Sequence, residues 1–341
     1  MAIRVLIVED SPLMQRLLCA ILGAHDDLKV AGVAEDPIDA REKIKQLKPD
    51  VITLDVEMPR MDGITFLERL MRLRPMPVVM VSSLTEANAE VTLRALELGA
   101  VDFVAKPRGD GSRDLQVFGA ELAEKVREAA AADVHVGPRE VKAAASVAVE
   151  FRPGGLIAVG GSTGATETIR ELLVRLPGNA PPVAIVQHMP EMFTRMFARR
   201  LDDLCALKVT EAANGETLQP GHAYIAPGDW HLRIEANGGN YVARLDQEAP
   251  LNRHRPSVDA LFRSVASAAG AKGAAVLLTG MGKDGAEGMG ALKRAGGATF
   301  AQDQASCVVF GMPRAAIEAG HAGHVDGVEG IARRLVDALR R

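Results

Sequence analysis

The chain has 341 residues, of which 48% are hydrophobic and 25% are charged, and its formal net charge at pH 7 is -4. This length and composition predict a globular protein with two domains, each burying its own core. The slightly acidic balance and the lack of a long Lys/Arg block argue against nucleic acid as the main partner.

The apolar runs and the cysteines exclude further classes. No apolar run has the length of a signal peptide or a membrane span, so we expect a cytoplasmic protein without membrane insertion. Cys19, Cys205 and Cys307 are widely spaced and odd in number. We therefore expect reduced thiols, and neither a disulfide framework nor a zinc site.

Over the first 125 residues, short apolar runs alternate with amphipathic stretches. The runs are "IRVLIV", "KVAGVA", "VITLDV", "PVVMVS" and "VDFVAKP", and the last helix is expected from about Asp114. Because parallel strands need crossover connections, five such units predict a doubly wound α/β domain of (βα)5 type, with helices on both faces of a parallel sheet.

An alanine-rich segment over residues 126–151 predicts a partly helical linker, because Gly137 and Pro138 break its pattern. After it the alternation resumes, and residues 152–341 predict a second doubly wound α/β domain. Its expected strands include "LIAVG", "VAIVQ", "AYIAP" and "AAVLLTG". The runs "LRIEA" and "YVARLD" flank "NGGN", which is typical of an antiparallel β-hairpin.

Polar residues follow the strands of the first domain where a parallel sheet forms its ligand sites. Glu9 and Asp10 follow the first strand, Asp55 the third, Ser82 the fourth and Lys106 the fifth. Three carboxylates at one edge repel one another unless a cation lies among them, and oxygen ligands suit Mg2+. With a lysine and a hydroxyl beside them, the set predicts phosphate transfer to Asp55. A single such acid would more often be a solvated strand end.

These five positions, together with "DVEMPRMDG" after the third strand, resemble the receiver domain of two-component response regulators. The resemblance implies that Mg2+ is held by Glu9, Asp10 and Asp55, with help from the backbone carbonyl of Glu57. It also implies that Ser82 and Lys106 sense the phosphoryl group and that Phe103 is the aromatic switch residue. A receiver has no downstream action of its own, so phosphorylation is expected to control the second domain.

In the second domain, three strand ends carry the residues of a nucleophilic triad. Ser162 lies in a G-x-S-x-G turn, His188 ends "VAIVQH", and Asp284 lies in the glycine-rich loop "TGMGKDGAEG". A serine hydroxyl needs a base to take its proton, and a carboxylate fixes the tautomer of that base. Backbone amides of the loop around Met281 are the candidate oxyanion donors.

Each of these signals also has a simpler interpretation. The G-x-S-x-G segment occurs as a flexible turn, His188 fits a structural histidine, and Asp284 fits a turn residue. The order Ser, His, Asp differs from that of α/β-hydrolases, which place the acid before the histidine.

Dinucleotide binding is a rival function, but the spacing is not G-x-G-x-x-G and the next strand lacks a terminal acid. A non-catalytic output module that binds a partner protein is a second rival.

Six segments of the second domain together resemble the catalytic domain of bacterial chemotaxis protein-glutamate methylesterases. They are "VGGSTGATE", "QHMPEMFTRMFARRL", "GHAYIAPGDWH", "NRHRPSVD", "LLTGMGKDGA" and "ASCVVFGMPRAA". The resemblance puts the catalytic triad on Ser162, His188 and Asp284 and the oxyanion amide on Met281. The chain departs from the family pattern at three positions: Gly161 replaces the usual alanine, Ala165 the usual glycine and Lys283 a common asparagine.

The resemblance also implies what the protein does. A member of this family hydrolyses glutamyl methyl esters on chemoreceptors with release of methanol, and many members deamidate receptor glutamines. The implied partners are methyl-accepting chemoreceptors as substrate and a chemotaxis histidine kinase as phosphodonor, and we expect a monomer. Mg2+ is the expected cofactor of the receiver and no cofactor is expected for the esterase reaction. A paralogue acting on another signalling protein is the alternative that the sequence leaves open.

Overall fold

A computed structural model of the chain describes residues 2–58, 61–83, 85–107, 112–134 and 149–341. The chain divides into two compact units, Met1–Arg139 and Glu140–Arg341, and each is described by itself. Most of the predicted linker over 126–151 lies outside the described residues, so the predicted domain boundaries stay predictions. Among the described helices, none has the length and apolar character needed to cross a bilayer.

The first unit is a five-stranded parallel sheet with the strand order β2-β1-β3-β4-β5. This confirms the predicted (βα)5 fold. Its strands are β1 (Ile3–Val8), β2 (Leu28–Ala34), β3 (Val51–Asp55), β4 (Val78–Ser82) and β5 (Asp102–Ala105). Its helices are α1 (Pro12–Gly23), α2 (Pro37–Leu47), α3 (Gly63–Leu73), α4 (Glu86–Glu97) and α5 (Ser112–Ala130).

Local sequence explains where these helices begin. Side chains of Ser11, Asp36, Asp62 and Thr85 precede α1 to α4, and each accepts a hydrogen bond from a backbone amide of the first turn. Such caps satisfy amides that have no partner within the helix. The strands β3 and β4 are buried along their whole length, as expected for central parallel strands.

The second unit has a seven-stranded sheet with the order β14-β13-β12-β6-β7-β9-β8, in which all neighbours are parallel. Its strands are β6 (Leu156–Gly161), β7 (Val183–Gln187), β8 (Lys208–Glu211), β9 (His222–Ile225), β12 (Gly273–Leu277), β13 (Ala298–Gln302) and β14 (His324–Asp326). The predicted antiparallel hairpin is present as a separate sheet of β10 (His231–Asn237) and β11 (Asn240–Asp246).

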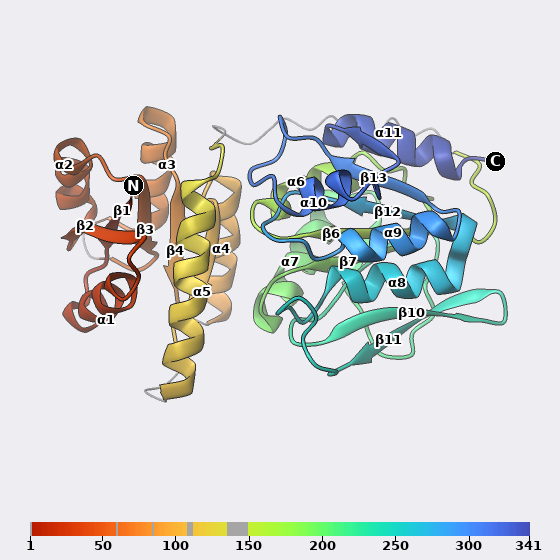
Figure 1. Cartoon of the computed structure of the whole chain (residues 1–341), viewed down its shortest axis with the longest axis horizontal. Coiled ribbons are helices and arrows are strands. Elements are labelled where there is room, and N and C mark those ends of the chain that lie inside the picture. Colours follow the sequence, from red (N-terminus) through yellow and green to blue (C-terminus); the bar gives the residue numbers. More distant parts are fainter. Residues whose placement is uncertain (1, 59–60, 84, 108–111, 135–148) are drawn as a thin grey trace. The chain divides into compact units, whose positions relative to one another are not determined.

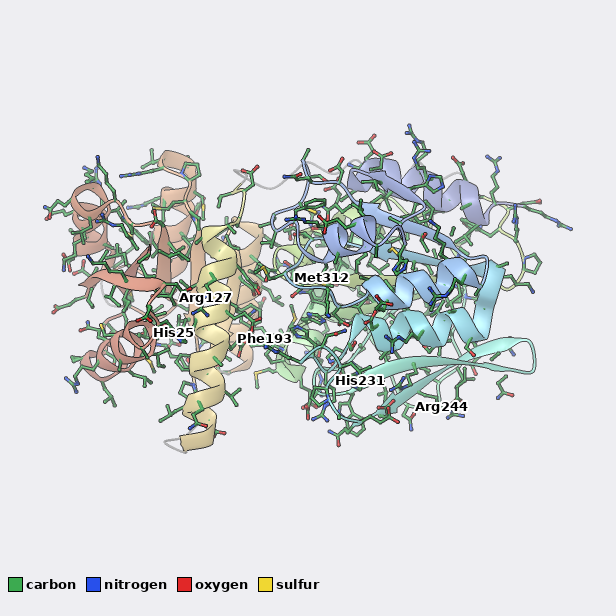
Figure 2. All side chains as sticks on the ribbon, in the orientation of Figure 1. His25, Arg127, Phe193, His231, Arg244 and Met312 are labelled. Carbon is green, nitrogen blue, oxygen red and sulfur yellow. The ribbon has the colours of Figure 1, made fainter. Side chains whose placement is uncertain are left out.

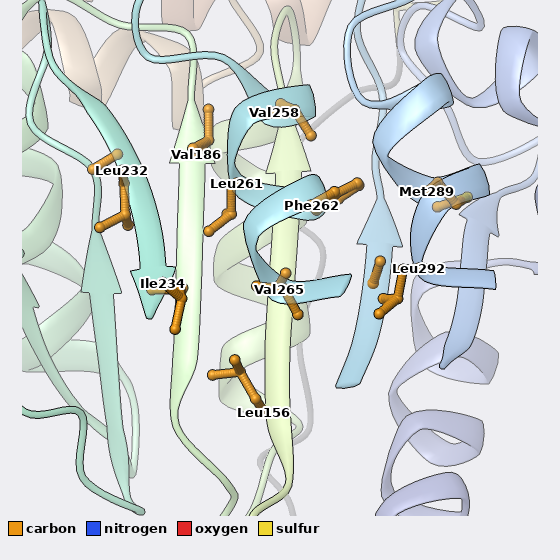
Figure 3. Close-up of a cluster of buried hydrophobic side chains, with 14 of the residues drawn as sticks. Leu156, Val186, Leu232, Ile234, Val258, Leu261, Phe262, Val265, Met289 and Leu292 are labelled. Atoms are coloured by element: carbon orange, nitrogen blue, oxygen red, sulfur yellow. The ribbon is translucent and has the colours of Figure 1, made fainter. Parts of the chain in front are cut away.

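Helices connect the strands of this sheet. They are α6 (Ala165–Val174), α7 (Glu191–Leu204), α8 (Val258–Ala269), α9 (Ala286–Arg294), α10 (Met312–Glu318) and α11 (Val328–Leu339), with a short 3-10 turn over Gly270–Lys272. Figure 1 shows α8 and α9 side by side over the strands, with the β10–β11 hairpin next to α8. Apolar side chains of α8, α9, the sheet and the hairpin form one core cluster, and Figure 3 draws part of it. Phe262 of α8 is fully buried there, and truncating a phenylalanine in such a place costs about 3–5 kcal/mol.

Each sheet has a point near its centre at which the direction of strand addition reverses. In the second unit the chain goes from β6 outward to β7, but from β12 outward to β13 on the other side. Right-handed crossovers therefore put α6 and α9 on opposite faces. In the first unit the reversal falls between β1 and β3. Ligand sites of parallel α/β sheets form beyond the carboxyl ends of the strands at such points.

Candidate active site and acidic pocket

The acidic pocket of the first unit lies at its reversal point, between β1 and β3. Glu9, Asp10 and Asp55 each offer a carboxylate oxygen within 4.8 Å of the others. The ammonium of Lys106 is 2.9 Å from Glu9 Oε2 and 2.9 Å from Asp55 Oδ2. The structure thus brings together four of the residues that the sequence predicts for this site.

The electrostatics of this pocket leave it short of positive charge. Burial raises the pKa of Glu9, and the nearby charge of Asp55 raises it further. Burial also raises the pKa of Asp55, although Lys106 and the backbone amides of Glu57 and Val56 act against the rise. One ammonium does not neutralise three carboxylates, so the donor set fits a divalent cation such as Mg2+.

The other predicted residues of the first unit lie on neighbouring strands. Ser82 ends β4, is fully buried and donates a 3.4 Å hydrogen bond to the carbonyl of Ser83. Phe103 on β5 is buried, and the ammonium of Lys125 lies 5.4 Å from the centre of its ring. The amide of Glu57 points at Asp55, and its carbonyl stays a predicted metal ligand.

In the second unit, Ser162 leaves the sheet at the reversal point between β6 and β12. Its amide donates to the carbonyl of Thr279 at 3.0 Å, and its carbonyl accepts from Gln187 Nε2 at 2.9 Å. Gly161 and Gln187 are partners in the register of β6 and β7. The next residue on each strand is Ser162 and His188, so the two leave adjacent strands at the same level.

His188 and Asp284 are joined directly. His188 Nε2 is 2.9 Å from Asp284 Oδ2, and only 8% of the His188 side chain is exposed. Burial by itself would raise the pKa of Asp284, but the hydrogen bonds from His188, Asn252 and Ser257 outweigh it and hold that pKa well below its usual value. The carboxylate is therefore ionised and accepts only, so Nε2 carries the proton of the neutral imidazole.

Consequently the other nitrogen of His188 is the one with a free lone pair. Within the part of the chain that the structure describes, Nδ1 of His188 is buried and has no hydrogen-bond partner. The hydroxyl of Ser162 does not bond to it in this structure. Catalytic hydrogen bonds are often long without substrate and tighten when it binds.

A cradle of donors holds Asp284. Its Oδ1 accepts from Asn252 Nδ2 at 2.8 Å, Ser257 Oγ at 2.8 Å and the amide of Asp259 at 3.2 Å, and its Oδ2 accepts from the amide of Val258 at 2.7 Å. The two amides belong to the first turn of α8, where the helix dipole favours negative charge.

A second histidine supports this cradle. His231, labelled in Figure 2, is fully buried, and its Nδ1 accepts from the amide of Ser257 at 3.2 Å. Its Nε2 donates to the carbonyl of Ala249 at 3.2 Å. His231 therefore fixes the residue that caps α8.

The loop after β12 lies directly against Ser162. A Cβ placed on Gly280 would be 2.7 Å from Ser162 Cβ and 2.5 Å from the sulfur of Met312, so no larger residue fits there without a shift. Met281 follows in this loop with 40% of its side chain exposed. The backbone amide of Met281 directly follows Gly280, the residue that packs against Ser162.

Sequence reasoning did not assign several residues of this site. Asn252 and Ser257 hold Asp284, and the ring of His254 stacks on that of His188 with the centroids 3.7 Å apart and the planes 10° apart. All three lie in "NRHRPSVD", one of the segments that carry the family resemblance. Arg255 is bound to Asp229 at 2.6 Å and to two backbone carbonyls.

Comparison with known proteins adds to this geometry. Residues 157–335 match the family model described as CheB methylesterase, and residues 5–113 match that of the response regulator receiver domain. A protein-glutamate methylesterase/protein-glutamine glutaminase of Nitrosomonas europaea is 53% identical over 345 residues, which cover 99% of this chain and 96% of that protein. A protein of the same description from Bordetella avium is 55% identical and covers 98% and 96%.

A solved structure agrees with these matches for the second unit. The CheB methylesterase catalytic domain of Thermotoga maritima is 42% identical, with a TM-score of 0.53. The likeness covers 54% of this chain and 98% of that domain. The similarity therefore spans a whole catalytic domain.

Proposed function

Because this chain belongs to the CheB methylesterase family and carries a response regulator receiver domain, we propose that it hydrolyses glutamyl methyl esters on methyl-accepting chemoreceptors in the cytoplasm. Methanol is the released product. The same site deamidates receptor glutamines in this proposal, because the similar proteins of Nitrosomonas europaea and Bordetella avium are also protein-glutamine glutaminases by name. Ser162, His188 and Asp284 come from a single copy of the chain, so the proposed triad needs no residue of a second copy, and we propose that the enzyme is a monomer.

One observation carries the mechanism: His188 binds the ionised Asp284 through Nε2 and keeps Nδ1 unpartnered within the described part of the protein. Nδ1 takes the proton of Ser162 as the serine oxygen attacks the ester carbonyl. The tetrahedral intermediate then expels the methoxy group, which leaves as methanol with the proton from Nδ1.

Water completes the reaction by the same path. Nδ1 takes a proton from water, the resulting hydroxide attacks the acyl-Ser162 ester, and the serine leaves with that proton to give glutamate. With a glutamine substrate the first leaving group is ammonia. Asp284 keeps the ring in the tautomer that presents a lone pair at Nδ1 and stabilises the imidazolium that forms.

The backbone amide of Met281 is the oxyanion donor in this proposal. The close contact between Gly280 and Ser162 supports it, because this contact puts the following amide near the carbonyl under attack. Loss of a donor of this kind costs on the order of 10²–10³ in kcat.

Phosphorylation of Asp55 by a chemotaxis histidine kinase controls the reaction. Glu9, Asp10, Asp55 and the carbonyl of Glu57 would hold Mg2+, which neutralises charge on the phosphoryl oxygens when bound. Lys106 and the hydroxyl of Ser82 donate to the phosphoryl group.

A switch residue is needed to carry the signal beyond this pocket. Phe103 fills that role in this proposal, because its ring lies on β5 just before Lys106. Its contact with the ammonium of Lys125 gives the ring a defined starting position.

The test is the release of labelled methanol from methylated receptor membranes. Wild type should release it, and Ser162→Ala should lose several powers of ten in rate, on the order of 10³–10⁶. A phosphodonor should raise the rate of wild type but not of Asp55→Asn. Near wild-type activity of Ser162→Ala would refute the mechanism. Activity only on another methylated signalling protein would show that this protein, and not a chemoreceptor, is the substrate.

A further inference from the structure

The imidazole of His254 lies flat on the imidazole of His188. The ring centroids are 3.7 Å apart and the planes differ by 10°. We propose that His254 is a positioning residue for the esterase reaction: its ring fixes the plane of His188 so that Nδ1 stays aimed at Ser162. This inference rests on the function proposed above.

A hydrogen bond at one atom does not fix the plane of a ring. Asp284 holds Nε2 of His188, but rotation about the terminal bond of a histidine side chain is soft, so the ring can still pivot about that contact. A flat partner against one face removes this freedom. Because Nδ1 is at the far side of the ring from the contact with Asp284, a small pivot displaces it from the serine.

The backbone around His254 is built to hold its ring in place. Leu251 and His254 exchange two backbone hydrogen bonds, of 3.1 and 2.8 Å, which close a tight turn. Both residues inside this turn, Asn252 and Arg253, have left-handed backbones with φ of 52° and 71°. Asparagine tolerates this conformation but arginine seldom adopts it, and such geometry persists only where the surroundings enforce it.

The same turn is tied to the acid of the triad. Asn252 Nδ2 donates to Asp284 Oδ1 at 2.8 Å and to Asp259 Oδ2 at 2.9 Å. Asp259 is itself anchored, because its Oδ1 accepts from the amide of Gly288 at 2.7 Å. One short turn therefore contacts Asp284 through Asn252 and His188 through His254, and it sets the position of the base relative to the acid.

Three substitutions at position 254 separate the contributions of bulk and planarity. His254→Phe keeps a flat ring without polar atoms, His254→Leu keeps bulk without a flat face, and His254→Ala removes both. A matched control is His324→Ala, because His324 also stacks on a ring, that of Phe300, at 5.4 Å. Methanol release from methylated receptor membranes gives kcat and KM for each, and Trp230 fluorescence reports folding of the same unit.

We expect kcat to fall about tenfold to a hundredfold in His254→Ala and His254→Leu, with KM within about twofold of wild type, because a misaligned base slows the chemical step rather than binding. His254→Phe should keep kcat within about threefold, and His324→Ala should match wild type. In proton NMR, the Nε2 proton of His188 should stay sharp in His254→Phe and broaden in His254→Leu.

The outcomes separate this inference from the proposed function. Wild-type kcat in His254→Leu, equal losses in His254→Phe and His254→Leu, or a change confined to KM would each overturn the positioning role. If wild type releases no methanol, or Ser162→Ala keeps its rate, the proposed function fails instead.

Discussion

Gly161 ends the strand before Ser162, and Ala165 begins the helix after it. The space between these two positions holds one methyl group, that of Ala165. A Cβ placed on Gly161 would lie 2.4 Å from Cβ of Ala165, far inside contact distance, with Gln187 Oε1 at 3.4 Å. The family pattern has the opposite arrangement, with alanine first and glycine second. We therefore predict that Gly161→Ala damages the turn and that Ala165→Gly repairs it.

The magnitudes follow from packing. Overpacking by one methyl group in a buried site costs about 1–3 kcal/mol. Ala165 is fully buried at the first position of α6, so Ala165→Gly loses about 0.8 kcal/mol of burial and up to about 1 kcal/mol of helix propensity. The double variant relieves the clash and refills the gap, so it should be more stable than the sum of the two single effects by at least about 1 kcal/mol.

The assay is denaturant unfolding followed by the fluorescence of Trp230, the chain's single tryptophan, which reports on the second unit alone. A loss of about 2 kcal/mol should also lower the melting temperature by about 4–8 °C for a unit of this size. Additivity of the two single effects to within about 0.5 kcal/mol would refute the reasoning, because residues in contact must couple.

Three further predictions concern single residues. Asp55→Asn should abolish activation by a phosphodonor. Burial raises the pKa of Asp55, so stability is lost as pH rises through that pKa and the carboxylate becomes ionised. Asp55→Asn should therefore also raise the melting temperature of the first unit at pH 7, measured by calorimetry. An unchanged melting temperature would contradict the electrostatic account. Gly280→Ala should lower kcat by about tenfold or more in the methanol assay, because its methyl group displaces Ser162, whereas a wild-type rate would show that the loop does not position the serine. The depressed pKa of Asp284 contributes stability above its unfolded pKa near 4, which is lost as pH falls toward the folded value. The free energy of unfolding should therefore fall less between pH 5 and 3 in Asp284→Asn than in wild type, and equal slopes by Trp230 fluorescence would contradict this.

The sequence predicted the two parallel α/β units because their strands are apolar and separated by clear helical patterns. It predicted the antiparallel hairpin because "NGGN" lies between two strand-like runs. It did not identify β8, β13 and β14 as strands. β8 and β14 are edge strands of four and three residues in which Val209 alone is buried, and β13 is a five-residue run after a glycine pair. Such strands take their structure from the neighbour they pair with, which a local pattern does not reveal.

The candidate site was predictable to a similar degree. Acids, serine and histidine after strand ends point to one edge of a parallel sheet, which made Ser162, His188 and Asp284 candidates, and the family resemblance then assigned the triad to them. The contacts of Asn252, His254 and Ser257 were not, because they depend on the course of an irregular loop. The choice of Nε2 for Asp284, which leaves Nδ1 for the serine, also depends on ring orientation and appears only in three dimensions.

The central claim is that Ser162 and His188 act as one unit in ester hydrolysis, and a single comparison of methanol release rates tests it. Ser162→Ala, His188→Ala and the double variant are measured on the same methylated receptor membranes. The account predicts that each single variant loses at least about 10³-fold in rate. The double variant should lose no more than the worse single variant, because each of the two residues acts in the reaction only through the other. Losses that multiply in the double variant, or a single variant near the wild-type rate, would contradict it.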